Sequence, residues 1–316
     1  MKPQRYYVHF KYFDGPLNSL IHLAKTVSFP GFERIPIFEV GAFFVRGLMK
    51  GALATRASSI AFNLFLAIFP AIIFFFTLIP YVPVENFQTE LLKLMENIMP
   101  QKAFIAVEEA IADIILQPRG GLLSFGFIAA LYFSTNGISA MIGAFNASYL
   151  TFDTRSWWNQ RLVSIVIVLI LFVLVTTAVA LITFGTWSLD FLVQKGWLEK
   201  NITFYIIDLL KWLIIIALFF FAIFILYRMA PAKRTKSKFI SAGASLATVM
   251  IISTSIGFSY YVNNFGNYNK LYGSLGTLMV VLLWMYFNAL SLLIGFELNT
   301  SFSSARRKHQ DKTKTL

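Results

Sequence analysis

Six stretches of the chain consist almost entirely of apolar residues. A helix that crosses a bilayer needs about 20 consecutive apolar residues, and each of the six reaches that length. They are residues 57–80, 122–147, 162–187, 204–228, 239–262 and 276–302. This pattern predicts an all-α, polytopic membrane helix bundle with six transmembrane helices, which together form one membrane domain over residues 57–302.

Two further segments are amphipathic. Residues 35–56 mix basic and apolar positions, which predicts a helix that lies in the membrane interface and ends an N-terminal segment, residues 1–56. Residues 85–118 predict two short amphipathic helices joined at Pro100, with an acidic polar face on the outer side. After the last span, residues 303–316 are expected to form a basic tail.

The distribution of Lys and Arg predicts the orientation in the membrane. Basic residues accumulate in cytoplasmic loops. Of the 27 Lys and Arg residues, 20 lie on one side, in residues 1–56, the loops 148–161 and 228–238, and the tail. We therefore expect both termini in the cytoplasm. The first 30 residues contain no continuous apolar run, so no cleaved signal peptide is expected.

The composition agrees with a membrane protein and excludes sites that need cysteine. Hydrophobic residues make up 57% of the chain and charged residues only 13%, whereas soluble domains are about a quarter charged. The net charge is +12, and most of the basic residues lie where they set the orientation in the membrane. The charge therefore gives no reason to expect a nucleic acid partner. The chain has no Cys, which excludes disulfides and thiolate metal sites.

No catalytic motif is present in the sequence. His9, His22 and His309 lie in the charged termini, and there is no HExxH, GxSxG or phosphate-binding glycine loop. A metal-dependent nuclease needs convergent carboxylates or histidines, and the acids on the cytoplasmic side are scattered. We therefore expect no enzymatic activity, no metal and no cofactor.

The first span carries three polar or helix-breaking positions on one face. Asn63, Pro70 and Thr77 are seven residues apart, and seven steps of a helix return to about the same direction. Pro70 leaves the carbonyl of Leu66 without its helical donor. We expect this face to point into the bundle. It is either part of a substrate path or a proline kink that neighbouring helices accommodate.

A second polar stripe lies on the last span. Asn288, Ser291, Gly295 and Asn299 fall within about 80° of one another around the helix, whereas Glu297 lies about 180° from Asn288. Glu297 therefore needs a partner of its own.

Arg56 is the favoured partner for Glu297, because the start of the first span and the end of the last share the cytoplasmic boundary. Arg155, Arg161 and Arg228 are alternatives at the same level. Three roles are open for the Glu297 carboxylate. It forms a structural ion pair, it takes part in handling substrate or protons, or it reaches interfacial water.

Small residues on the second and fifth spans predict close helix packing. Gly126, Gly137 and Ala144 lie on one stripe of the second span, and the fifth begins with "SAGASLAT" at residues 241–248. Residues of this size let two helix backbones approach closely. Close packing alone, or packed faces that slide during transport, would both produce this pattern.

Several stretches resemble the signature stretches of the YihY/BrkB family over roughly residues 40–302. They are "ATRASSIAFNLFLAIFPAIIFFFTLIP" (54–80), "RSWWNQRL" (155–162), "YRMAPAKRTKSKFISAGA" (227–244) and "YGSLGTLMVVLLWMYFNALSLLIGFELN" (272–299). The motif positions are Phe69, Pro70, Tyr227, Pro231, Tyr272, Gly273, Gly276, Gly295, Glu297 and Asn299. Asn63 departs from the family, which often has Tyr there.

The resemblance implies a bacterial inner-membrane protein with six spans. Members of the family once carried the name ribonuclease BN, now regarded as a misassignment, and some relatives are linked to serum resistance or to export of lipid A precursors. We therefore expect a transporter or flippase-like exporter of an anionic lipid or envelope precursor. Its partners would be membrane lipids with anionic headgroups at the cytoplasmic face.

The alternative to transport is a membrane scaffold that binds a partner through residues 85–118. A membrane-bound nuclease is not expected. Whether the chain forms a homo-oligomer is left open by the sequence.

Overall fold

The computed structural model describes residues 37–50, 52–81, 118–148, 155–197, 201–232, 241–265 and 274–314. Throughout these ranges the regular structure is helical, with no strand. The elements are α2 (Ile37–Lys50), α3 (Leu53–Leu78), the short 3-10 helix η1 (Ile79–Tyr81), α6 (Gly120–Ser148), α7 (Trp157–Gln194), α8 (Ile202–Met229), α9 (Ala242–Phe265) and α11 (Ser274–Lys314). Six of them are long and apolar enough to cross a membrane, which confirms the predicted all-α fold.

Two helices are longer than the hydropathy pattern predicts. α7 has 38 residues and α11 has 41, so α11 continues to Lys314 through the region expected to be a separate tail. Residues 303–314 contain neither Gly nor Pro, and nothing in them stops a helix. The predicted outer segment, residues 85–118, lies outside the described residues apart from its last position.

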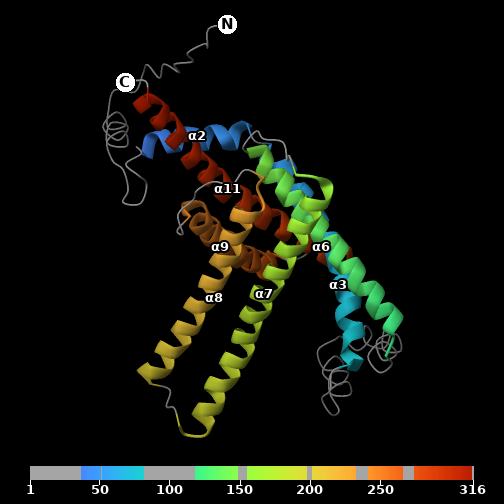
Figure 1. Ribbon diagram of the computed structural model, residues 1–316. Helices are drawn as coiled ribbons and strands as arrows, with labels where there is room; N and C mark the ends of the chain where they lie inside the picture. Colours follow the sequence, from blue (N-terminus) through green and yellow to red (C-terminus); the bar gives the residue numbers. More distant parts are fainter. Residues whose placement is uncertain are drawn as a thin grey trace.

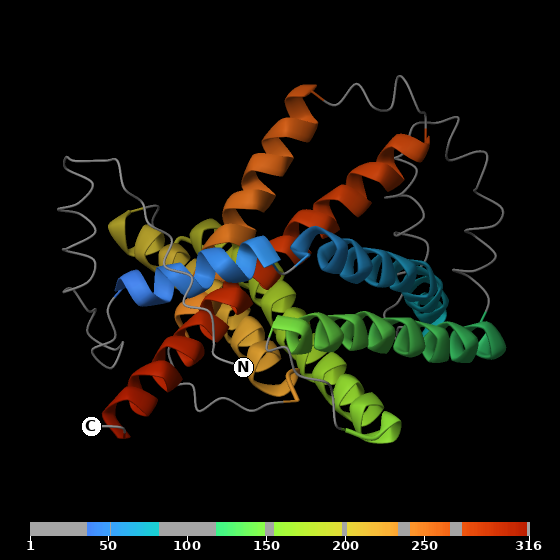
Figure 2. The same ribbon diagram turned by 90° about the horizontal axis from the view of Figure 1, so that it is seen from above.

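The six long helices form three antiparallel pairs. α3 packs on α6, α7 on α8, and α9 on α11. In Figures 1 and 2 the three pairs meet at one end of the molecule and diverge toward the other. We call the meeting point the hub and the diverging parts the legs. The hub is the end that the distribution of Lys and Arg predicts to face the cytoplasm.

The hub contains the main core of the protein. Phe145 stacks on Phe296 with ring centroids 4.2 Å apart, and Tyr227 meets both rings edge-on. All six long helices contribute buried residues here, including Ile60, Ile142, Phe145, Ile167, Phe224, Tyr227, Ala244, Ala247, Leu293 and Phe296. Each of these comes from the hub half of its helix, so burial of apolar surface holds the pairs together at one end.

Glycines bring the paired helices into backbone contact, as the small-residue stripes predict. A Cβ added to Gly243 of α9 would overlap the carbonyl of Gly295 on α11, so neither position has room for a side chain. On α6, a Cβ at Gly126 would lie 3.0 Å from the backbone of Phe74, and one at Gly137 would lie 2.6 Å from Leu64.

α2 lies across α11 at the hub end (Figure 2). Its buried Val40 packs with Ala305 of α11, and Phe43, Leu298 and Phe302 surround this contact. This small cluster attaches the amphipathic helix to the extended end of α11 and places α2 over the last turns of the transmembrane part.

The legs bury much less of their surface than the hub. In the most apolar stretch of α7 only 6% of the residues are buried, against 33% in α6. Exposed side chains on the legs are large and apolar, for example Phe172, Phe184, Leu209 and Ile256. In a membrane protein such surfaces face lipid tails or another protein.

Candidate functional site

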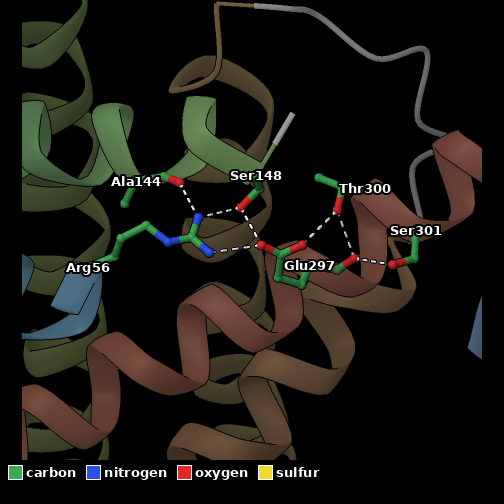
Figure 3. A network of polar contacts seen from close by, with 6 residues as sticks. All are labelled: Arg56, Ala144, Ser148, Glu297, Thr300 and Ser301. Carbon is green, nitrogen blue, oxygen red and sulfur yellow. Dashed lines mark hydrogen bonds and ion pairs between the residues drawn. The ribbon is translucent and has the colours of Figure 1, made fainter. Parts of the chain in front are cut away.

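Arg56 and Glu297 form an ion pair in the hub (Figure 3). Arg56 Nη2 donates to Glu297 Oε1 at 3.0 Å, while Nη1 donates to the Ala144 carbonyl and to Ser148 Oγ. Ser148 Oγ in turn donates to Glu297 Oε1 at 2.7 Å. Three helices therefore meet at one carboxylate: α3 through Arg56, α6 through Ser148 and α11 through Glu297. We call Arg56, Ser148 and Glu297 the clasp.

The other oxygen of Glu297 is covered by its own helix and by α2. Thr300 Oγ1 donates to Oε2 at 3.2 Å and to the Glu297 carbonyl at 2.8 Å, and Ser301 also donates to that carbonyl. A Cβ added to Gly47 of α2 would lie 2.7 Å from Oε2. Only a residue without a side chain lets α2 lie this close, so α2 closes the carboxylate off. Glu297 is 3% exposed.

The sequence favoured this pairing, and the three alternative arginines lie elsewhere. Arg155 donates to the Ala230 carbonyl and Arg161 to Asn136 Oδ1, each at 2.6 Å, while Arg228 is exposed at the end of α8. Arg56 itself is not fully satisfied, since its Nε is buried without a hydrogen-bond partner. In the clasp, the charge of Arg56 is therefore paired with that of Glu297, but the Nε–H donor of Arg56 is unused.

The polar stripe of α11 packs against α9. Asn299 Oδ1 accepts from the Gly243 N–H and its amide nitrogen donates to Ser241 Oγ, so Asn299 caps the first turn of α9. The first N–H groups of a helix have no partner within the helix, and a polar side chain can satisfy them. Gly295 supplies the close crossing one turn earlier. The hub end of the stripe thus joins two helices.

Asn288 lies nearer the middle of α11 and is only partly satisfied. Its amide nitrogen donates to the Trp284 carbonyl at 2.7 Å, but its Oδ1 is buried without a donor. An unpaired carbonyl oxygen costs free energy in an apolar layer.

The predicted stripe of α3 is buried at two of its three positions. Pro70 and Thr77 are buried, and Thr77 Oγ1 donates to the carbonyls of Ile73 and Phe74. Asn63 is half-buried and donates to the Ser59 carbonyl of its own helix. Phe69, which precedes Pro70, is exposed.

Of the remaining motif positions, Tyr227 and Pro231 lie at the hub, whereas Gly276 lies in the first turn of α11, at its leg end. Tyr227 donates its hydroxyl to the Leu292 carbonyl at 2.6 Å, next to Gly295. Pro231 and Gly276 are buried. Tyr272 and Gly273 lie outside the described residues.

Three residues that contribute to the site are not marked by the sequence. Ser148 and Gly47 carry no charge and belong to no stripe, so nothing marked them as neighbours of Glu297. The third is Asn146, whose Oδ1 accepts from the Ala232 N–H at 2.9 Å and so ties the end of α6 to the end of α8.

A second ion pair lies on the α7–α8 legs. Lys211 Nζ is 2.7 Å from Asp208 Oδ1 and donates to Thr186 Oγ1 of α7 at 3.1 Å. Within the described ranges, no three His, Asp or Glu side chains gather in a way that could hold a metal ion.

Comparison with known proteins gives consistent matches. The family model described as "Virulence factor BrkB" matches residues 44–315. The "Putative ribonuclease-like protein YfkH" of Bacillus subtilis (strain 168) is 30% identical over 245 residues, covering 78% of this chain and 88% of that protein. A "UPF0761 membrane protein" of Xanthomonas campestris pv. campestris (strain B100) is 34% identical over 87 residues, but only 20% of its length is matched. No solved structure is significantly similar.

Proposed function

This chain belongs to the virulence factor BrkB family of membrane proteins, and we propose that it translocates an anionic lipid or envelope precursor across a bacterial inner membrane, with both termini in the cytoplasm. The clasp is the observation that carries the proposal. Ionisable residues within membrane spans are costly and mark substrate paths by default. Here such a residue joins α3, α6 and α11 at the point where all three helix pairs converge.

The shape of the molecule supports a mechanism of alternating access. The three pairs are closed at the hub and apart at the legs (Figure 1). Transporters of many folds expose their site to each side in turn by rocking one helix bundle against another. In this chain, rocking would bring the legs together and separate α3 and α6 from α11, which requires the clasp to open.

An anionic substrate can open the clasp while Arg56 keeps an anionic partner. Arg56 has donors on Nη1, Nη2 and the unpartnered Nε. A phosphate accepts such hydrogen bonds in the same planar geometry as a carboxylate. The headgroup would take over Arg56 from Glu297, and Thr300, on the same helix as Glu297, would continue to donate to the released carboxylate.

Lipid translocation in vesicles tests this proposal. Purified protein is placed in vesicles that contain phosphatidylglycerol with a fluorescent headgroup, and an impermeant quencher reports the outer-leaflet pool. Wild type is expected to expose the inner-leaflet pool, and Glu297→Gln is expected to do so at least tenfold more slowly. Asp208→Asn is the matched control, because it makes the same chemical change in the other described ion pair. Equal rates in both variants, or a wild type no faster than empty vesicles, would refute the proposal.

Partner binding is a second candidate function, favoured by the exposed apolar surface of the α7–α8 legs. If these legs dock a membrane partner, replacing Phe172 and Leu209 by Ala would release that partner while vesicle assays show no lipid movement. The word ribonuclease in the name of the Bacillus protein is not extended to this chain. Purified protein is expected to leave tRNA intact with Mg²⁺ or Zn²⁺ present, and cleavage that a point mutation abolishes would reverse that view.

A further inference from the structure

Arg161 lies one turn inside the start of α7, at the hub end of the molecule. Trp157 and Trp158 precede it and are 63% and 74% exposed. Exposed tryptophans at the end of a transmembrane helix occupy the headgroup layer. Arg161 therefore lies just below that layer, where lipid phosphates are within reach of a long side chain.

The surroundings of Arg161 hold its guanidinium but do not neutralise it. Nη1 donates to Asn136 Oδ1 at 2.6 Å, and the guanidinium carbon lies 4.7 Å from the centre of the Tyr132 ring. Both groups are neutral. Among the described residues, Arg56 and Lys211 each have a carboxylate partner, and Arg161 has none. Its charge is oriented by α6 but left without a counter-ion.

The side chains next to Arg161 face the lipid. Tyr132 is 54% exposed, and Ile128, one turn away on α6, and Leu162, beside Arg161 on α7, are exposed as well. A cation without a counter-ion is expensive at the edge of an apolar layer. The anion that is nearest to hand at this position is the phosphate of a membrane lipid.

We propose that Arg161, Asn136 and Tyr132 form a docking site for the phosphate of an anionic phospholipid. Asn136 fixes the guanidinium through Nη1, which leaves its other N–H groups to donate to a phosphate oxygen. Tyr132 supports the cation from below. The acyl chains lie against Ile128 and Leu162.

The site rests on the proposed function for its purpose, since a lipid translocator needs a place where headgroups collect before they move. It does not depend on the clasp, which lies on α3, α6 and α11. A binding measurement therefore tests the site separately. If the wild type translocates phosphatidylglycerol but shows no preference for binding it, the site alone is removed. If the wild type binds it through Arg161 but does not translocate it, the proposed function alone is removed.

Arg228 provides a matched control. It is a second arginine at the same end of the molecule, in the last turn of α8, and it is exposed. If the membrane surface attracts both arginines only through general electrostatics, replacing either should have the same effect.

The experiment counts lipids bound to the full-length protein in neutral detergent micelles by native mass spectrometry. The probes are phosphatidylglycerol, phosphatidylcholine and, as a soluble phosphate, glycerol 3-phosphate. Wild type is expected to bind one phosphatidylglycerol in preference to phosphatidylcholine. Arg161→Gln should weaken that binding about tenfold, as expected when one charge-assisted hydrogen-bonded pair is lost. Arg228→Gln should change it less than about twofold, because an exposed charge contributes little.

Thermal unfolding in phosphatidylcholine shows whether each variant is folded. If Arg161→Gln does not fold, Tyr132→Leu replaces it, since Tyr132 is exposed, and a loss of about threefold is expected from the weaker cation–ring contact. The proposal is overturned if both arginine variants weaken binding equally, or if phosphatidylglycerol binds no better than phosphatidylcholine. It is also overturned if glycerol 3-phosphate, and not the lipid, shows the dependence on Arg161.

Discussion

The two ion pairs that the structure describes have the same chemistry and different consequences. Lys211 and Asp208 are three residues apart on α8 and 2.7 Å from each other, and the Asp208 side chain is 37% exposed. Arg56 and Glu297 are 241 residues apart and 3.0 Å from each other, with side chains 12% and 4% exposed. The longer bond is the more important one, because it joins the three transmembrane helices α3, α6 and α11 beneath the amphipathic helix α2. The shorter bond stays within one pair of legs.

Breaking the clasp should produce the largest effect. Glu297→Ala leaves the Arg56 guanidinium buried without a counter-ion, and loss of one partner of a buried pair costs about 3–5 kcal/mol. Unfolding with a denaturing detergent in mixed micelles measures this loss of free energy. The double variant Arg56→Met with Glu297→Leu removes both charges and should recover most of the stability. A single variant that loses less than about 1 kcal/mol would place the clasp among ordinary surface pairs.

Filling the α9–α11 crossing should come next. Gly243→Ala adds a Cβ against the Gly295 carbonyl, and overpacking of this kind costs about 1–3 kcal/mol. Gly257, further along α9, is the control, since a Cβ there meets nothing within 4 Å. Gly257→Ala should be neutral or slightly stabilising, because Ala favours helix more than Gly. Similar losses at both glycines in the same unfolding assay would show that the hub crossing is not tightly packed.

Removing the cap that joins α11 to α9 should cost somewhat less. Asn299→Ala removes the acceptor of the Gly243 N–H and one of the donors to Ser241 Oγ, and the loss of a cap costs about 0.5–2 kcal/mol. Asn201 caps the exposed start of α8 through a bond to the Thr203 N–H at 3.0 Å. Asn201→Ala should lie at the low end of that range, since water can replace the exposed cap. A larger loss at Asn201 than at Asn299 would reverse the ranking of hub over legs.

The smallest effect is expected at the outer ion pair. Asp208→Asn should lower the free energy of unfolding by less than about 1 kcal/mol, because an exposed partner is screened by water and Lys211 keeps its bond to Thr186. Raising the salt concentration should change the stability of the wild type and of this variant to a similar extent. If Asp208→Asn is as harmful as Glu297→Ala, the contrast between the two pairs fails.

The sequence predicts the six spans and the main ion pair. The six spans follow from length and hydropathy, and the pairing of Glu297 with Arg56 followed from two facts, its place opposite the polar stripe and the membrane boundary that the two residues share. Both arguments need only helix geometry and the topology of the chain.

The rest of the site depends on how the helices cross. Nothing in the sequence marks Ser148 as a bridge or Gly47 as the point where α2 passes over Glu297, because neither residue is unusual for its segment. The divergence of the legs escapes prediction for the same reason, since exposed and buried apolar faces look alike when the solvent is lipid. Asn299 stood out by its polarity, but its task as a cap for α9 became clear only from the crossing.

Cross-linking α2 to α11 tests the central claim, that the hub must open for lipid to move. Gly47 of α2 lies against Glu297 Oε2, so α2 has to leave α11 before a headgroup can reach the clasp. The chain has no native Cys, so Val40→Cys and Ala305→Cys can be joined with a thiol cross-linker that a reductant cleaves. Ser255→Cys with Trp284→Cys, within the α9–α11 pair, is the control. We predict that the cross-link between α2 and α11 stops translocation of labelled phosphatidylglycerol, that reduction restores it, and that the control cross-link has little effect. Translocation at the uncross-linked rate with α2 held against α11 would contradict the claim.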